Sequence, residues 1–214
     1  MKQKKLTPRK IMNILTGFFF ALYSAYNVFI IIRDFSALPS EGLLISAVVA
    51  LIFALFAAYV WTAGVKKKNA LFRMIRRTVF ILALFAIFVL KARMIDRVIQ
   101  YINSFMFETV FFDGEKFDFS MLPGVLFGAS YFFTLAAMLL LIIYFLFIRK
   151  RILLFPRASV VLPVIAMLLF IGSLILDMIL CLGYGISLEA NMKRTLVIRP
   201  VFYLGLIGMC AYCL

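Results

Sequence analysis

The sequence predicts an all-α integral membrane protein, a single bundle of six transmembrane helices with both termini in the cytoplasm. The chain of 214 residues is 66% hydrophobic and only 15% charged, and its mean hydropathy is +1.11. A water-soluble domain of this length could not hide so many apolar side chains with so few polar residues to cover them. The composition therefore excludes an ordinary soluble globule and a disordered chain.

The net charge of +14 indicates membrane topology rather than nucleic-acid binding. Basic residues concentrate at 2–10, 66–77 and 149–157, and no acidic residue lies in any of these clusters. Most acidic residues lie in the connections between the clusters. Because Lys- and Arg-rich connections stay in the cytoplasm, the clusters place both ends of the chain inside the cell, and no nucleic-acid partner is expected.

The first three spans are expected at 11–32, 43–65 and 78–98, each long enough to cross a hydrocarbon layer of about 30 Å. The first is too long for the apolar region of a secretory signal peptide, so we interpret it as a retained signal anchor. Basic and apolar residues alternate over 66–77, which is typical of a short interfacial helix on anionic lipid.

The last three spans are expected at 122–148, 159–186 and 196–214. All six must be helical, because lipid offers no partner for unpaired backbone groups. The connection before the fourth span carries several phenylalanines around Asp113 and Gly114, which predicts either a flap over the outer end or an interfacial segment. No segment is large enough to fold alone, so residues 1–214 form one polytopic membrane domain.

Small residues recur at every fourth position on three of the spans, a spacing that lets helix backbones approach closely. They are Gly17, Ala21 and Ala25 on the first span, Ser46, Ala50, Ala54 and Ala58 on the second, and Gly124 and Gly128 on the fourth. Packing inside the bundle is the favoured interpretation. An interface to a second copy or to another membrane subunit is the alternative.

Ionisable residues at the predicted outer end of the bundle are the candidate substrate-binding residues. They are Lys91, Arg93, Asp96, Arg97, Asp177 and Arg199. Counting about 1.5 Å per residue places Asp177 level with the polar end of the third span, where Arg93, Arg97 or Lys91 is its expected partner. The excess of cations predicts an outward-facing vestibule for a small anionic solute, bound through a carboxylate or phosphate. The alternative is that Lys91 snorkels and the other charges are solvated or form structural pairs.

No catalytic motif is recognisable in the sequence, and an enzyme acting on lipid, the third hypothesis, would need Asp177 or Glu108 as its acid or base. The chain has no histidine and no phosphate-binding or serine-hydrolase motif, so we expect no enzyme, no metal site and no cofactor. An aspartyl protease is disfavoured because Arg93 and Arg97 would keep Asp96 ionised. Cys210 and Cys213 form C-x-x-C on the side where thiols stay reduced, so we interpret them as packing residues.

Six compact spans, a polar vestibule and no catalytic apparatus favour a solute carrier or the membrane-embedded substrate-binding subunit of a transporter. The helix number, the chain length and the spacing of Ala21 and Ala25 resemble the substrate-binding subunits of energy-coupling-factor importers. That resemblance implies a second membrane subunit and cytosolic ATPases as partners. The alternative is a non-catalytic scaffold, regulatory or immunity-type protein that acts through helix packing. The short loops and basic clusters suit a multi-pass protein of a bacterial plasma membrane.

Overall fold

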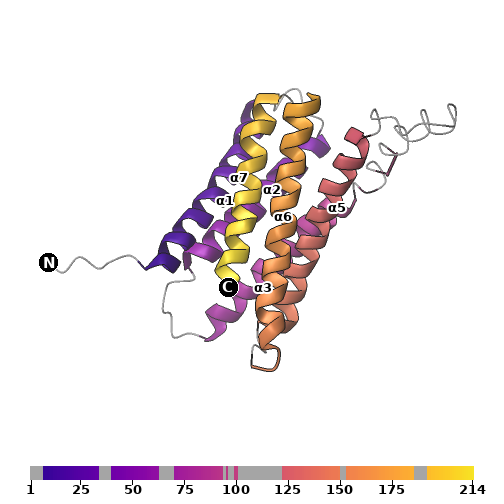
Figure 1. The fold of residues 1–214 in the computed structure, drawn as a ribbon. Coiled ribbons are helices and arrows are strands. Elements are labelled where there is room, and N and C mark those ends of the chain that lie inside the picture. Colours follow the sequence, from indigo (N-terminus) through magenta and orange to yellow (C-terminus); the bar gives the residue numbers. More distant parts are fainter. Residues whose placement is uncertain are drawn as a thin grey trace.

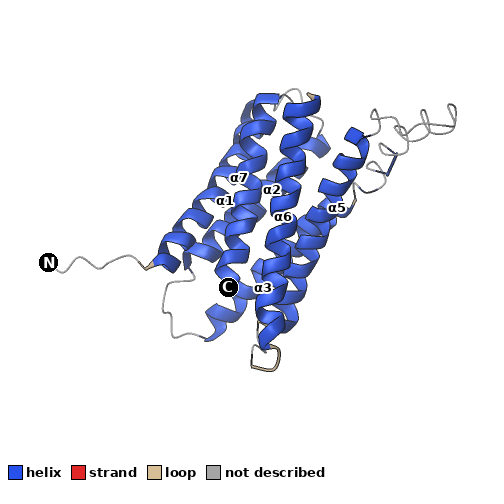
Figure 2. Ribbon diagram, viewed as in Figure 1, coloured by secondary structure: helices blue, strands red, loops and turns tan. Residues whose placement is uncertain are grey.

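The computed structural model describes residues 7–33, 40–62, 70–93, 95, 99–100, 122–149, 153–185 and 192–214. The long elements of this part of the chain are all helical and lie side by side in one bundle (Figures 1 and 2). They are α1 (Pro8–Arg33), α2 (Ser40–Thr62), α3 (Ala70–Ala92), α5 (Leu122–Ile143) with its π-helical continuation η2 (Tyr144–Ile148), α6 (Pro156–Tyr184) and α7 (Met192–Cys213).

Five of these helices are long and apolar enough to cross a membrane. The qualifying segments are Pro8–Arg33, Gly42–Thr62, Leu122–Ile148, Pro156–Tyr184 and Leu196–Cys213. The chain is therefore a polytopic helical membrane protein. The helix α3 does not qualify. Its uncharged stretch is only about 20 Å long, because Arg76 and Arg77 lie at one end of it and Lys91 lies at the other.

The boundaries of α3 differ from the expected span at 78–98. The helix begins at Ala70, so the described part of the basic segment 66–77 forms the first two turns of α3 rather than a separate interfacial helix. It ends at Ala92, and Arg93 lies in a turn. The difference arises because hydropathy marks only the apolar middle of a helix, whereas the backbone hydrogen bonds continue into its charged ends.

The helices form a closed ring in which α3 is the most weakly attached member. Along the ring, α1 packs on α2 and α7, α6 packs on α7 and α5, and α3 lies between α5 and α2. The contacts of α3 with its two neighbours are far fewer than those between α1 and α2 or between α5 and α6. We call the end where α1 begins and α7 ends the terminal end, and the other the opposite end (Figure 1).

The centre of the ring is filled by aromatic side chains, which we call the aromatic core. It comprises Phe20, Phe53, Phe56, Phe80, Phe145 and Phe202, all at most 3% exposed. Ring centroids of Phe53 and Phe202 are 5.7 Å apart, and those of Phe56 and Phe80 are 5.1 Å apart. These phenylalanines come from five elements of the bundle and belong to one buried cluster, so they join the helices at its centre.

The small residues divide between buried and exposed positions. Gly17 is buried, and a Cβ there would lie 2.1 Å from Trp61 Nε1, so α1 and α2 approach closely at this point. The Ser24 hydroxyl donates to the Ala50 carbonyl oxygen at 2.7 Å between the same two helices. In contrast, Ala54 and Ala58 are exposed on α2. Packing inside the bundle thus buries some of the recurring small residues and leaves others exposed on the helix surface.

Candidate binding site

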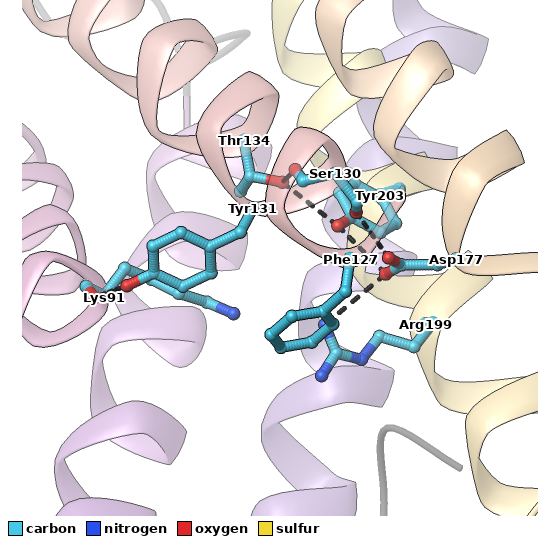
Figure 3. Close-up of a pocket in the computed structure, with 8 residues that line it drawn as sticks. All are labelled: Lys91, Phe127, Ser130, Tyr131, Thr134, Asp177, Arg199 and Tyr203. Carbon is cyan, nitrogen blue, oxygen red and sulfur yellow. Dashed lines mark hydrogen bonds and ion pairs between the residues drawn. The ribbon is translucent and has the colours of Figure 1, made fainter. Parts of the chain in front are cut away.

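Three helices direct pairs of polar side chains towards one point near the opposite end of the bundle. Each pair is spaced four residues apart, which places both side chains on one helix face. The pairs are Ser130 and Thr134 on α5, Ser173 and Asp177 on α6, and Arg199 and Tyr203 on α7. We call these six residues the polar network. Figure 3 shows five of them converging from the three helices.

The carboxylate of Asp177 is the centre of the network and is only 2% exposed. Ser130 donates a hydrogen bond to its Oδ1, and the Tyr203 hydroxyl donates to its Oδ2 at 3.1 Å. The Arg199 guanidinium forms an ion pair with the same Oδ2 at 3.5 Å. An ion pair supported by hydroxyl donors is the arrangement in which a buried charge is tolerated inside a membrane bundle.

The remaining hydroxyls connect the three helices to one another. Thr134 Oγ1 lies 3.0 Å from the Tyr203 hydroxyl and donates to Ser173 Oγ at 3.1 Å. Ser173 can in turn donate to the Ser130 carbonyl oxygen at 3.0 Å. Because Ser173 and Thr134 are at most 2% exposed, each bond replaces a contact with water that burial has removed.

A small cavity adjoins the network on the side of α3 (Figure 3). Its lining residues are Lys91, Phe127, Ser130, Tyr131, Thr134, Asp177, Arg199 and Tyr203. About 20 Å³ is open to water, which is room for one molecule. The ammonium group of Lys91 lies 5.6 Å from the ring centroid of Phe202. The backbone carbonyl oxygen of Lys91 accepts a hydrogen bond from the Tyr131 hydroxyl.

The structure brings together three of the six predicted site residues and places a fourth elsewhere. Lys91, Asp177 and Arg199 line the same cavity. Arg93 is exposed in the turn after α3. Asp96 and Arg97 lie outside the described residues.

The ion-pair partner found for Asp177 differs from the expected ones. The sequence favoured Arg93, Arg97 or Lys91, but the structure pairs Asp177 with Arg199. Both residues lie on helices that pack directly against each other, whereas the main neighbours of α3 are α2 and α5. Heights counted from the sequence do not show which helices are adjacent, and adjacency decides which cation pairs with Asp177.

The hydroxyl groups of the network were not predicted from the sequence. Ser130, Thr134, Ser173 and Tyr203 are ordinary residues of apolar spans and attract no attention singly. The spacing is the signal that could have revealed them, since three spans each carry two polar residues four positions apart. Such a repeat predicts that each span directs a polar face to the interior.

Metal and thiol chemistry have little support among the residues that the structure describes. Within them, no group of three His, Cys, Asp or Glu residues could hold a metal ion. Cys181, Cys210 and Cys213 are free thiols, and the first two are buried. The polar network is therefore the best-formed candidate site in this part of the chain.

No family model, curated protein or solved structure matches the chain. The resemblance to substrate-binding subunits of energy-coupling-factor importers consequently rests on helix number, chain length and the spacing of Ala21 and Ala25. In the structure Ala21 packs against the core and Ala25 is exposed.

Proposed function

We propose that this protein is a membrane-embedded binding protein or carrier for a small anionic solute, which binds at the cavity beside the polar network. The observation that carries the proposal is the lining of that cavity, where Lys91 and Arg199 come from different helices and Asp177 supplies the single carboxylate. Arginine binds carboxylate and phosphate through parallel hydrogen bonds, and the lysine adds a second positive charge.

The described state is a closed one, since the cavity admits no more than a water molecule. Access then requires movement of a neighbouring element. The helix α3 is suited to this role because its packing on α2 and α5 is the weakest in the ring. Its end at Lys91 is held to α5 by the hydrogen bond from Tyr131. We therefore propose that displacement of α3 from α5 admits the solute.

A binding protein or carrier is favoured over an open channel. Buried aromatic side chains of the core pack closely in the centre of the bundle, which favours a binding site over an open polar passage. A carrier would need a second conformation to release solute on the other side, whereas the binding subunit of a transporter would pass it to a partner.

The orientation that we propose has the terminal end in the cytoplasm of a bacterial cell and the cavity facing outward, with α3 as a sixth span. The three basic clusters without acids support it, because such segments are retained in the cytoplasm. Entry of the solute is then from the outer face of the plasma membrane.

Thermal unfolding of the purified protein in neutral detergent tests the binding site. We expect one or more members of a panel of small carboxylates and inorganic phosphate to raise the melting temperature by about 5 °C at saturating concentration, with chloride as reference. Lys91→Gln should abolish the shift while retaining the ion pair between Asp177 and Arg199. Arg157→Gln is the matched control, because it removes an exposed cation at the terminal end.

The proposal fails if no anion in the panel stabilises the protein or if the two variants respond alike. A scaffold acting through helix packing is the second candidate, favoured by the exposure of Ala54 and Ala58 on one face of α2. Light scattering would support it by showing an oligomer that Ala58→Leu dissociates.

A further inference from the structure

An arginine at the terminal end contacts neutral aromatic side chains from three elements. Arg149 follows η2 and donates through Nη1 to the Tyr59 hydroxyl at 2.8 Å and through Nη2 to the Tyr212 hydroxyl at 3.0 Å. Its guanidinium carbon lies 4.8 Å from the ring centroid of Phe145. Tyr59 and Tyr212 are buried, so this positive charge lies against the apolar interior.

Two further arginines lie against the same tyrosines, and a third binds η2 beside them. Arg76 lies 5.1 Å from the ring centroid of Tyr59, and Arg9 lies 5.8 Å from that of Tyr212. Arg77 donates to the carbonyl oxygen of Phe145 in η2. We call these groups the arginine–tyrosine cluster, which comprises Arg9, Arg76, Arg77, Arg149, Tyr59 and Tyr212.

Among the residues that the structure describes, no Asp or Glu side chain contacts this cluster. The acidic residues of the chain are Asp34, Glu41, Asp96, Glu108, Asp113, Glu115, Asp118, Asp177 and Glu189. Of these, Glu41 lies in the first turn of α2 and Asp177 in the second half of α6, both towards the opposite end. Positive charges in a medium of low dielectric are costly without a counter-charge, and Arg76 Nε is buried with no hydrogen-bond partner. An anion bound beside the cluster would offset part of this cost.

A groove beside the cluster has the size and the lining to receive one. It measures about 340 Å³ and runs between the first turns of α1 and the last turn of α7. Its lining residues are Pro8, Arg9, Met12, Asn13, Ala211, Tyr212 and Leu214. Asn13 lines the groove, and its Oδ1 is buried without a hydrogen-bond partner, so a small movement of this side chain would bring an unused acceptor into the groove.

The groove adjoins an exposed apolar face of α1. Ile11, Ile14, Leu15 and Phe18 are each at least 46% exposed along this part of the helix. In a membrane these side chains contact acyl chains, since nothing in the described chain covers them. A ligand in the groove can therefore be polar at Arg9 and Asn13 and apolar along α1 and Met12.

We propose that this groove binds an anionic phospholipid with a hydroxylated headgroup, of the phosphatidylglycerol type. The phosphodiester lies against Arg9 and balances the positive charge of the arginine–tyrosine cluster. A headgroup hydroxyl donates to Asn13 Oδ1, and the acyl chains follow the exposed face of α1. A soluble phosphate would meet Arg9 equally well but would leave the apolar lining in contact with water.

Delipidated protein in neutral detergent provides the test, with melting temperature followed during titration. Short-chain phosphatidylglycerol should raise it by about 5 °C, whereas short-chain phosphatidylcholine and glycerol 3-phosphate should leave it nearly unchanged. Arg9→Gln should weaken the apparent affinity for phosphatidylglycerol about tenfold. Lys10→Gln is the matched control, because Lys10 is the exposed neighbouring cation and does not line the groove.

A second variant tests the groove without changing its charge. Asn13→Leu removes the unpaired acceptor, so the lipid-free protein should be at least as stable as the unsubstituted protein. The preference of the Asn13→Leu variant for phosphatidylglycerol over phosphatidylcholine should nevertheless be smaller than that of the unsubstituted protein. Equal stabilisation by phosphatidylcholine, equal stabilisation by glycerol 3-phosphate, or equal affinities of the Arg9→Gln and Lys10→Gln variants would each overturn the proposal. These results are independent of solute binding at the opposite end.

Discussion

A single carboxylate, Asp177, organises the polar groups of the opposite end. It accepts from two hydroxyls on α5 and α7 and pairs with a guanidinium on α7, so three helices meet at one side chain. Hydrogen bonds among apolar helices contribute through such interhelical contacts, because the hydrophobic effect between helices is absent in lipid. The network therefore has a structural role in addition to any role in binding.

Removal of this carboxylate should be strongly destabilising. Asp177→Leu leaves Arg199 without its ion-pair partner, and losses of about 3–5 kcal/mol accompany such a change in a buried pair. Asp177→Asn should cost less, because the amide oxygen can still accept a hydrogen bond. Thermal unfolding in detergent checks the prediction, and the melting temperature of Asp177→Leu should be lower than that of Asp177→Asn.

The double variant Asp177→Leu with Arg199→Met separates charge from packing. It should recover much of the stability lost in Asp177→Leu, since no unpaired charge remains. A double variant as unstable as Asp177→Leu would mean that the unpaired charge of Arg199 is not the source of the loss.

Only part of the candidate site could be predicted from the sequence. Lys91, Asp177 and Arg199 stood out because ionisable residues are rare inside apolar spans. The pairing of Asp177 with Arg199 was out of reach, because it depends on which helices are neighbours in the ring. The arginine–tyrosine cluster was hidden for the same reason, since Arg149 meets Tyr59 and Tyr212 across three separate elements.

At the scale of the elements, the close approach of α1 and α7 depends on glycine. A Cβ at Gly205 would lie 2.7 Å from two carbon atoms of the Phe20 ring. That ring packs against Phe53 and Phe56, so it has little freedom to move away. The glycine thus sets the distance between the two helices that join the beginning and the end of the chain.

Gly205→Ala should consequently weaken the bundle. Crowding a packed interior costs about 1–3 kcal/mol, and the better helix propensity of alanine offsets only part of this. Gly183→Ala is the control, because its Cβ would meet nothing nearer than 4.0 Å and it gains the same propensity. Comparison of the two melting temperatures checks the prediction, and similar values would contradict it.

The helices were predictable from hydropathy because their apolar stretches are long. Expected and observed limits agree within a few residues for α1, α2, α6 and α7, and the expected span 122–148 coincides with α5 and η2 together. The exception is α3, whose basic first turns lie outside any apolar run. The π-helical geometry of η2 had no sequence signal, since YFLFI reads as ordinary apolar helix.

At the scale of the whole molecule, the proposed orientation can be measured by cysteine labelling. In a Cys213→Ala background, Arg93→Cys marks the opposite end and Arg157→Cys marks the terminal end, both at exposed positions. An impermeant maleimide should label Arg93→Cys in intact cells and Arg157→Cys only after permeabilisation. The reverse pattern would place the cavity in the cytoplasm and exclude uptake of an external solute.

The ring also constrains how the protein is made. Its last helix, α7, lies between α6 and the first helix, α1, and carries the cation that pairs with Asp177. During synthesis the aspartate therefore reaches the bilayer before Arg199 has left the ribosome. A truncated protein that lacks α7 would therefore hold an unneutralised acid among its apolar helices and leave one flank of α1 uncovered, so we expect it to be degraded faster than the full chain.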